Sequence, residues 1–116
     1  HYNVPDLYQL VVMTSDRMVQ RHPDLVRRVS RALSRSLALT HQQPEESLGL
    51  YLKANPLADP SLSARTFDAT LPYFPETLQQ EEARWKSVRD WLHSRGVIGK
   101  KMSLETLFTN DFLPKL

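Results

Sequence analysis

The sequence predicts a mainly helical fold with about six helices and one strand. One apolar run, Tyr8–Met13, is rich in Val and Leu and lacks a helical period, which indicates a strand buried on both faces. Most of the remaining chain carries apolar residues at helical spacing. Prolines and Ser or Asp caps separate these stretches, so the boundaries of the predicted helices are clear.

Two helices follow the predicted strand. Ser15 is the expected N-cap of a short helix, which ends before Pro23 because a residue that precedes proline disfavours the helical region. Pro23 then opens a long helix at its first position, where the missing N–H costs nothing. Apolar residues recur inside the long helix and predict one buried face: Leu25, Val29, Ala32, Leu33 and Leu37.

The long helix also carries most of the excess positive charge of the chain, whose formal net charge is +2. Its arginines lie largely off the apolar stripe: Arg27, Arg28, Arg31 and Arg35. A nucleic-acid interface would need a second basic element and interleaved aromatics or glycines, and neither is nearby. We therefore interpret the arginines as a solvated face and expect no nucleic-acid partner.

Two more helices are predicted in the middle of the chain. One covers residues 43–56, with Pro44 near its start, and the next covers residues 58–74, with Asp59 as cap and Pro72 at its end. In the second of these helices the residues expected to face inward are Leu62, Thr66, Ala69 and Leu71 or Tyr73.

The last two helices are predicted over residues 76–96 and from Ser103 to the end of the chain. Gly96 is the expected glycine after the first of them, and Trp85, Val88 and Leu92 share one of its faces. The final helix would begin at a weak capping box, in which Thr106 stands in place of the usual Glu.

Composition narrows the class of protein. The chain has 116 residues, 41% hydrophobic and 24% charged, which predicts one domain with a packed core. It has no cysteine, which excludes disulfides, thiolate metal sites and cysteine nucleophiles from these residues. No apolar run reaches membrane-spanning length. No signal peptide is visible, but a cleaved signal would leave no trace, so the compartment stays open.

A buried strand needs neighbours, because each unpaired backbone group in it would cost about 1–3 kcal/mol. The only other candidate strand, Gly96–Met102, is short and flanked by glycine. The partners of Tyr8–Met13 are therefore expected outside these residues. Either the chain is a piece of a larger α/β protein, or two copies pair strand to strand.

The order of the motifs resembles a known family. An apolar strand runs into a short helix and then into Pro-x-Leu-Val in "LVVMTSDRMVQRHPDLVRRVSRAL", and "HQQPEESLGLYLKANP" follows. A Trp-containing helix, a Gly-Val-Ile turn and "TNDFLP" close the chain. This order resembles the C-terminal part of periplasmic substrate-binding proteins of ABC importers, in the branch for nitrate, sulfonates, taurine and thiamine-pyrimidine precursors.

The resemblance implies a type II periplasmic binding-protein fold, which has two α/β lobes around a ligand cleft. Residues 1–116 would form a single domain, or a fragment that completes one lobe, and the strand would pair with the missing N-terminal lobe. The implied function is binding of a small polar or heteroaromatic ligand, such as a thiamine pyrimidine precursor, outside the cytoplasm. The implied partners are the membrane subunits of the transporter. No cofactor is implied.

The resemblance also suggests where a ligand would bind. Tyr2, Asn3 and Tyr8 lie on the segment that would leave the crossover between lobes, where the cleft forms. An aromatic ring there can stack on a flat ligand, and an amide can hydrogen-bond its polar edge. The alternative is that these three are ordinary residues of a turn and a strand flank.

Catalysis and metal binding find little support in the sequence. No histidines stand at a metal-binding spacing, and adjacent pairs such as Glu45 and Glu46 point in different directions from a helix. A eukaryotic branch of pyrimidine-precursor synthases uses a cysteine-rich motif, which these residues lack. We therefore expect no enzyme and no metal site. The alternative function is a self-standing helical interaction domain that would dimerise through Tyr8–Met13 and hold an acidic partner on its arginine face.

Overall fold

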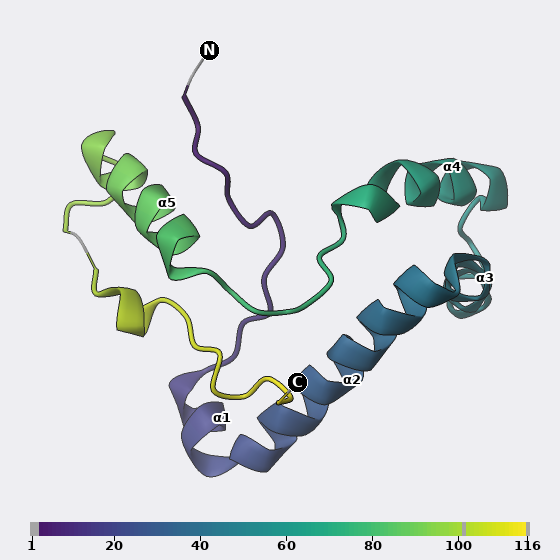
Figure 1. Cartoon of the computed structure of the whole chain (residues 1–116), viewed down its shortest axis with the longest axis horizontal. Coiled ribbons are helices and arrows are strands. Elements are labelled where there is room, and N and C mark those ends of the chain that lie inside the picture. The colour runs from purple at the N-terminus through teal and green to yellow at the C-terminus, as the bar shows by residue number, and fades with distance from the viewer. Residues whose placement is uncertain (1–2, 101, 116) are drawn as a thin grey trace. The chain divides into compact units, whose positions relative to one another are not determined.

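The computed structural model describes residues 3–100 and 102–115, and within these it contains helices and no strand (Figure 1). The α-helices are α1 (Asp16–Arg21), α2 (Pro23–Gln42), α3 (Pro44–Ala54), α4 (Pro60–Thr70) and α5 (Glu82–Ser94). Two short 3₁₀ turns are η1 (Leu71–Tyr73) and η2 (Leu104–Thr106). The prediction of a mainly helical chain is confirmed. None of the described helices is both long enough and apolar enough to cross a membrane.

Local signals set the helix ends, as predicted. The Ser15 hydroxyl accepts a hydrogen bond from the Met18 N–H at 3.2 Å, and the Asp59 carboxylate accepts one from the Leu62 N–H at 2.6 Å. Each satisfies one of the N–H groups that the first turn of a helix leaves without a partner. Helices α2, α3 and α4 each begin at a proline.

Helix α5 ends in a Schellman motif. Gly96 has a φ of +70°, which is the left-handed region that favours glycine. Its N–H donates to the His93 carbonyl at 3.0 Å, and the Val97 N–H donates to the Leu92 carbonyl at 3.0 Å. The predicted role of Gly96 is confirmed.

The chain divides into two compact units, and the first consists of His1–Val26 and Gln79–Leu113. Trp85 of α5 is the centre of its aromatic contacts. The Trp85 ring stacks on Phe108 with centroids 5.7 Å apart and planes 6° apart, and it meets Tyr8 at 5.8 Å with a tilt of 41°. Helix α5 therefore holds both the N-terminal segment and the C-terminal segment of this unit.

The predicted start of the fifth helix at residue 76 is wrong, because α5 begins at Glu82. The side-chain amide of Asn110 instead hydrogen-bonds to the backbone N–H and carbonyl of Gln80. The Gln80 N–H donates to Asn110 Oδ1 at 2.9 Å, and Asn110 Nδ2 donates to the Gln80 carbonyl at 2.8 Å. The Gln80 side chain in turn accepts from Trp85 Nε1 at 2.7 Å. These bonds compete with helix formation before Glu82.

The predicted final helix is also wrong, because only the single turn η2 forms. Ser103 makes no side-chain cap, and the Thr106 hydroxyl donates to the Ser103 carbonyl at 2.7 Å. After η2 the chain bends so that Asn110 can reach Gln80, and the Leu113 N–H closes a turn on the Asn110 carbonyl at 3.2 Å. The "TNDFLP" ending is thus a structural clip rather than a helix.

The second unit consists of Arg27–Leu78 and Pro114–Leu116. Phe67 of α4 meets Phe74 edge to face at 6.4 Å, and His41 Nε2 donates to the Pro75 carbonyl at 3.0 Å. The half-buried residues of α4 and η1 include Ser63, Ala64, Phe67 and Leu71. Of the residues predicted to face inward, Leu62, Thr66, Ala69 and Tyr73 are exposed, and only Leu71 is correct. The half-buried face at Ser63, Ala64 and Phe67 therefore lies more than a third of a turn around α4 from the predicted face.

The predicted buried strand does not form. Tyr8–Met13 has no assigned strand and is drawn as an irregular tube (Figure 1). The Leu10 and Met13 side chains are 93% and 85% exposed. A strand exists only as part of a ladder, and no other described segment supplies one. The prediction that these residues cannot pair among themselves is consistent with this outcome, whereas the prediction of burial is wrong.

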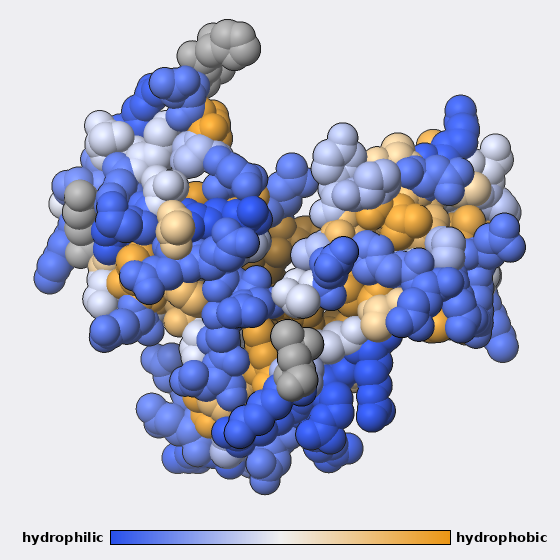
Figure 2. Space-filling model, viewed as in Figure 1, coloured by the Kyte–Doolittle hydropathy of each residue, from blue (hydrophilic) through white to orange (hydrophobic). Residues whose placement is uncertain are grey.

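No described residue is fully buried, so the expected packed core is absent from the described part of the chain. The predicted buried face of α2 is largely open, because Leu25, Val29, Ala32 and Leu33 are exposed and only Leu37 is half-buried. Apolar surface also lies open over α3 and α4 (Figure 2). Amphipathic helices are present, but these residues do not cover their apolar faces.

Replacing Asn110 with alanine tests the clip. The substitution removes both bonds to Gln80 and leaves a partly buried N–H without its acceptor, so we expect a loss of about 1–3 kcal/mol in the free energy of unfolding. Urea denaturation followed by tryptophan fluorescence measures the loss. Asn55→Ala is the control, because Asn55 makes a single exposed bond to the Tyr51 carbonyl. Equal urea midpoints for the two variants would contradict the role of Asn110.

Candidate functional site

The residues predicted to contact a ligand lie at the N-terminal end of the first unit. Tyr2 lies outside the described residues. Asn3 is exposed and has a φ of +46°, in the left-handed region that asparagine adopts more readily than most residues. Val4 and Pro5 follow directly, and Tyr8 lies five residues after Asn3 on the same segment.

Tyr8 is held against the first turn of α5. Its hydroxyl oxygen accepts a hydrogen bond from the Glu81 N–H at 2.6 Å. The guanidinium carbon of Arg84 lies 4.6 Å from the centre of the Tyr8 ring, within cation–π range, and the Trp85 ring lies beside it. In this arrangement the hydroxyl and much of the ring of Tyr8 are already in contact with the protein.

Arg84 makes a second contact with the same segment. Its Nη2 lies 3.0 Å from a carboxylate oxygen of Asp6, with the two side chains 31% and 78% exposed. An exposed ion pair of this kind adds little stability. The ion pair instead helps to orient the N-terminal segment, because the same guanidinium contacts both Asp6 and the Tyr8 ring. We call these four residues, Asp6, Tyr8, Glu81 and Arg84, the segment anchor.

Sequence reasoning found Tyr8 but missed Arg84 and Glu81. Both are ordinary charged residues near the start of a helix, and more than 70 positions separate them from their partners. No local pattern in the sequence signals such a pairing. Only the fold brings these residues together.

An apolar hollow of about 210 Å³ lies next to the segment anchor. It is lined by Pro5, Leu7, Tyr8, Trp85, Val88, Trp91 and Leu92. Its volume exceeds the roughly 150 Å³ of a cavity that holds benzene, so a single aromatic ring fits by size. Trp91 and Trp85, which the sequence analysis assigned no ligand role, both belong to this lining. The Nε1 of Trp91 is buried and has no hydrogen-bond partner.

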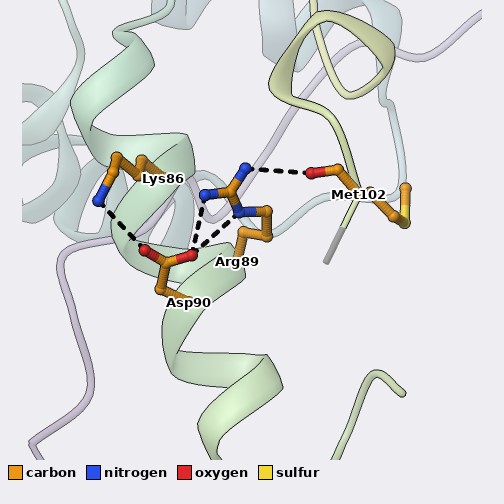
Figure 3. A network of polar contacts seen from close by, with 4 residues as sticks. All are labelled: Lys86, Arg89, Asp90 and Met102. Carbon is orange, nitrogen blue, oxygen red and sulfur yellow. Dashed lines mark hydrogen bonds and ion pairs between the residues drawn. The ribbon is translucent and has the colours of Figure 1, made fainter. Parts of the chain in front are cut away.

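A second hollow of about 450 Å³ contains both acidic and basic groups, and is lined by Glu82, Arg89, Ser103, Leu104, Glu105 and Phe108. Arg89 is committed to structural bonds there (Figure 3). Its Nε lies 3.0 Å and its Nη2 2.9 Å from Asp90 Oδ1, and its Nη1 donates to the Met102 carbonyl at 3.1 Å. Lys86 pairs with the other oxygen of Asp90 at 3.2 Å. This network ties the chain before η2 to α5.

Two of the histidines bond to backbone carbonyl groups. His41 Nε2 donates to Pro75, and His93 Nδ1 donates to the Ile98 carbonyl at 3.2 Å. Within residues 3–100 and 102–115 no three His, Asp or Glu side chains gather as a metal-binding group. The expectation that the protein uses no metal stays a prediction.

Comparison with known proteins adds to this geometry. The family model described as NMT1/THI5 like matches residues 1–47. The match includes the segment with Asn3 and Tyr8, helix α1 and all of α2. This chain is related to the NMT1/THI5-like proteins. This match supports the resemblance to that branch of substrate-binding proteins, which the motif order indicated.

Two curated proteins are similar to this chain over most of its length. One is the 4-amino-5-hydroxymethyl-2-methylpyrimidine phosphate synthase of Legionella pneumophila, which is 32% identical over 94 residues, or 81% of this chain and 30% of the relative. The other is the riboflavin-binding protein RibY of Chloroflexus aurantiacus, which is 26% identical over 113 residues, or 89% of this chain and 32% of the relative. The chain thus spans about a third of the length of these relatives.

A Tyr8→Phe substitution tests the segment anchor. Phenylalanine keeps the ring against Arg84 and Trp85 but leaves the Glu81 N–H without its acceptor, so we expect a loss of about 0.5–1.5 kcal/mol of stability. Urea denaturation checks the loss, and Tyr73→Phe on the exposed turn η1 is the matched control. If both variants unfold at the urea midpoint of the unsubstituted chain, the hydroxyl contributes nothing.

Proposed function

We propose that this chain is the C-terminal part of the solute-binding component of an ABC importer, and that the protein binds a small heteroaromatic ligand outside the cytoplasm. The observation that carries the proposal is the NMT1/THI5-like match over residues 1–47, which contain the predicted ligand-contacting segment. The names of both relatives refer to flat nitrogen heterocycles, a pyrimidine and riboflavin. A thiamine pyrimidine precursor is the first ligand to test.

The open apolar surfaces support a chain that completes one lobe of a larger two-lobed α/β protein. Leu25 and Val29 on α2 and the segment Tyr8–Met13 leave apolar side chains in water. Burying such side chains stabilises a protein by about 1.5–3 kcal/mol each, so a covering lobe would supply a large stabilisation. In this proposal the missing lobe supplies the sheet next to Tyr8–Met13, and the membrane subunits of the transporter are the partners of the assembled protein.

We propose binding rather than catalysis, although one relative is named a synthase. The support is that the candidate acid–base and cationic groups of the first unit are used in structural bonds. His93 bonds to a carbonyl, Arg89 to Asp90 and Met102, and Arg84 to Asp6. Detection of a phosphorylated pyrimidine product with the purified protein would overturn this part of the proposal.

The ligand proposal is tested on the protein encoded by the full reading frame that contains these residues. The probes are 4-amino-5-hydroxymethyl-2-methylpyrimidine, riboflavin, taurine and nitrate, added in a thermal-shift assay. A ligand at 100 times its Kd stabilises the folded state by about 2.7 kcal/mol, which raises the melting temperature by several degrees. We expect this rise with a heterocycle and not with nitrate. Indifference to all four probes would reject the proposal.

One observation favours a second candidate, a self-standing interaction domain that dimerises through Tyr8–Met13. This segment exposes Leu10, Val12 and Met13 and carries no charge, as expected of an edge that pairs with another strand.

Val11→Pro separates the two candidates. Proline removes a backbone donor, so a strand-paired dimer of the 116-residue chain would dissociate. Light scattering on the chain and on the variant measures this directly. We expect a monomer in both cases, because we propose that the natural neighbour of this segment is the missing lobe. A dimer that the substitution abolishes would favour the interaction domain instead.

A further inference from the structure

One side chain, that of Arg84, and one backbone group, the Glu81 N–H, contact a short stretch of the N-terminal segment. Asp6 receives the Arg84 guanidinium at 3.0 Å, and Tyr8 receives the same guanidinium against its ring at 4.6 Å. The Tyr8 hydroxyl is fixed by the Glu81 N–H at 2.6 Å. Residues 6–8 are thereby attached to the first turn of α5 at three points.

Arginine is suited to this double contact. A guanidinium is planar, so it can pair with a carboxylate through its edge while its face lies on an aromatic ring. A lysine ammonium is a compact, strongly hydrated charge and cannot satisfy both partners with the same geometry. Arg84 is only 31% exposed, since these contacts cover most of its side chain.

The link from this attachment to Asn3 is short and stiff. Three residue steps separate Asn3 from Asp6, which limits their distance to about 11 Å. Pro5 fixes its own φ, and it restricts Val4 to extended conformations. Motion of Asn3 relative to α5 is therefore limited, and the direction of its amide depends on where residues 6–8 are held.

We infer that Arg84 is a positioning residue of the binding site: it contacts no ligand, but fixes the segment that presents Asn3. This inference rests on the proposed function, because it assigns Arg84 a role in the same site. Holding a ligand-contacting amide in its bound direction before the ligand arrives reduces the entropy lost on binding. Arg84→Ala should therefore weaken binding without removing any contact to the ligand.

The experiment is a double-mutant cycle in the full-length protein, with affinities measured by calorimetry for 4-amino-5-hydroxymethyl-2-methylpyrimidine and for riboflavin. Asn3→Gly removes the amide and keeps the left-handed backbone, since glycine adopts positive φ freely. We expect Arg84→Ala and Asn3→Gly each to weaken binding by about fivefold to tenfold. The double variant should be no weaker than Asn3→Gly alone, because Arg84 acts through Asn3.

Two controls separate positioning from general stability. Lys86→Ala removes another cation of α5, which pairs with Asp90 at 3.2 Å and should leave affinity unchanged. Arg84→Lys keeps a charge for Asp6 but loses the fork geometry, so it should recover part of the affinity. Melting temperatures of all the ligand-free variants show whether any loss of affinity follows from unfolding.

The outcomes distinguish the positioning role of Arg84 from the proposed ligand-binding function. Additive losses in the double variant, or an unchanged affinity for Arg84→Ala, would overturn the positioning role while leaving the proposed function in place. An equal loss with Lys86→Ala would do the same. Failure of the unsubstituted protein to bind either heterocycle would overturn the proposed function and the positioning role together.

Discussion

The first unit of the structure depends on the contacts of Trp85. Its ring stacks on Phe108 from the C-terminal segment and meets Tyr8 from the N-terminal segment, and its N–H bonds to the Gln80 side chain. Three stretches far apart in sequence therefore meet at one side chain. A single buried aromatic pair contributes about 0.5–1.5 kcal/mol beyond its area. The geometry that it enforces matters more, because it places the segment anchor and the Asn110 clip at the start of the same helix.

The features that the sequence predicted correctly are those whose causes are local. Ser15 and Asp59 cap helices through residues three positions away, and Gly96 ends α5 through its own backbone freedom. The start of α5 and the fate of the last segment were mispredicted, because both depend on Asn110 bonding to Gln80 across 30 residues. The helical pattern in residues 76–81 does not reveal that Asn110 will bond to the Gln80 backbone.

In the candidate site, too, the sequence indicated the segment but not the distant contacts that hold it. The motif order pointed to the segment with Asn3 and Tyr8, and the family match covers that segment. The contacts that hold it, above all Arg84 on Asp6, had no signal in the sequence. The apolar residues of α2 and of Tyr8–Met13 were predicted to be buried, but most of them are exposed, and the sequence does not say what could cover them. The chain spans about a third of the length of its two curated relatives.

The exposed segment has a consequence for handling the isolated chain. Residues 8–14 contain no proline and no charge and are rich in Val and Leu, which is the composition of peptides that stack into cross-β fibrils. Asp6 before it and Asp16 with Arg17 after it are the nearest charges, and they act as gatekeepers that repel a second copy in register. Solubility of the isolated chain therefore depends on these charges at its two edges, and falls when salt screens them.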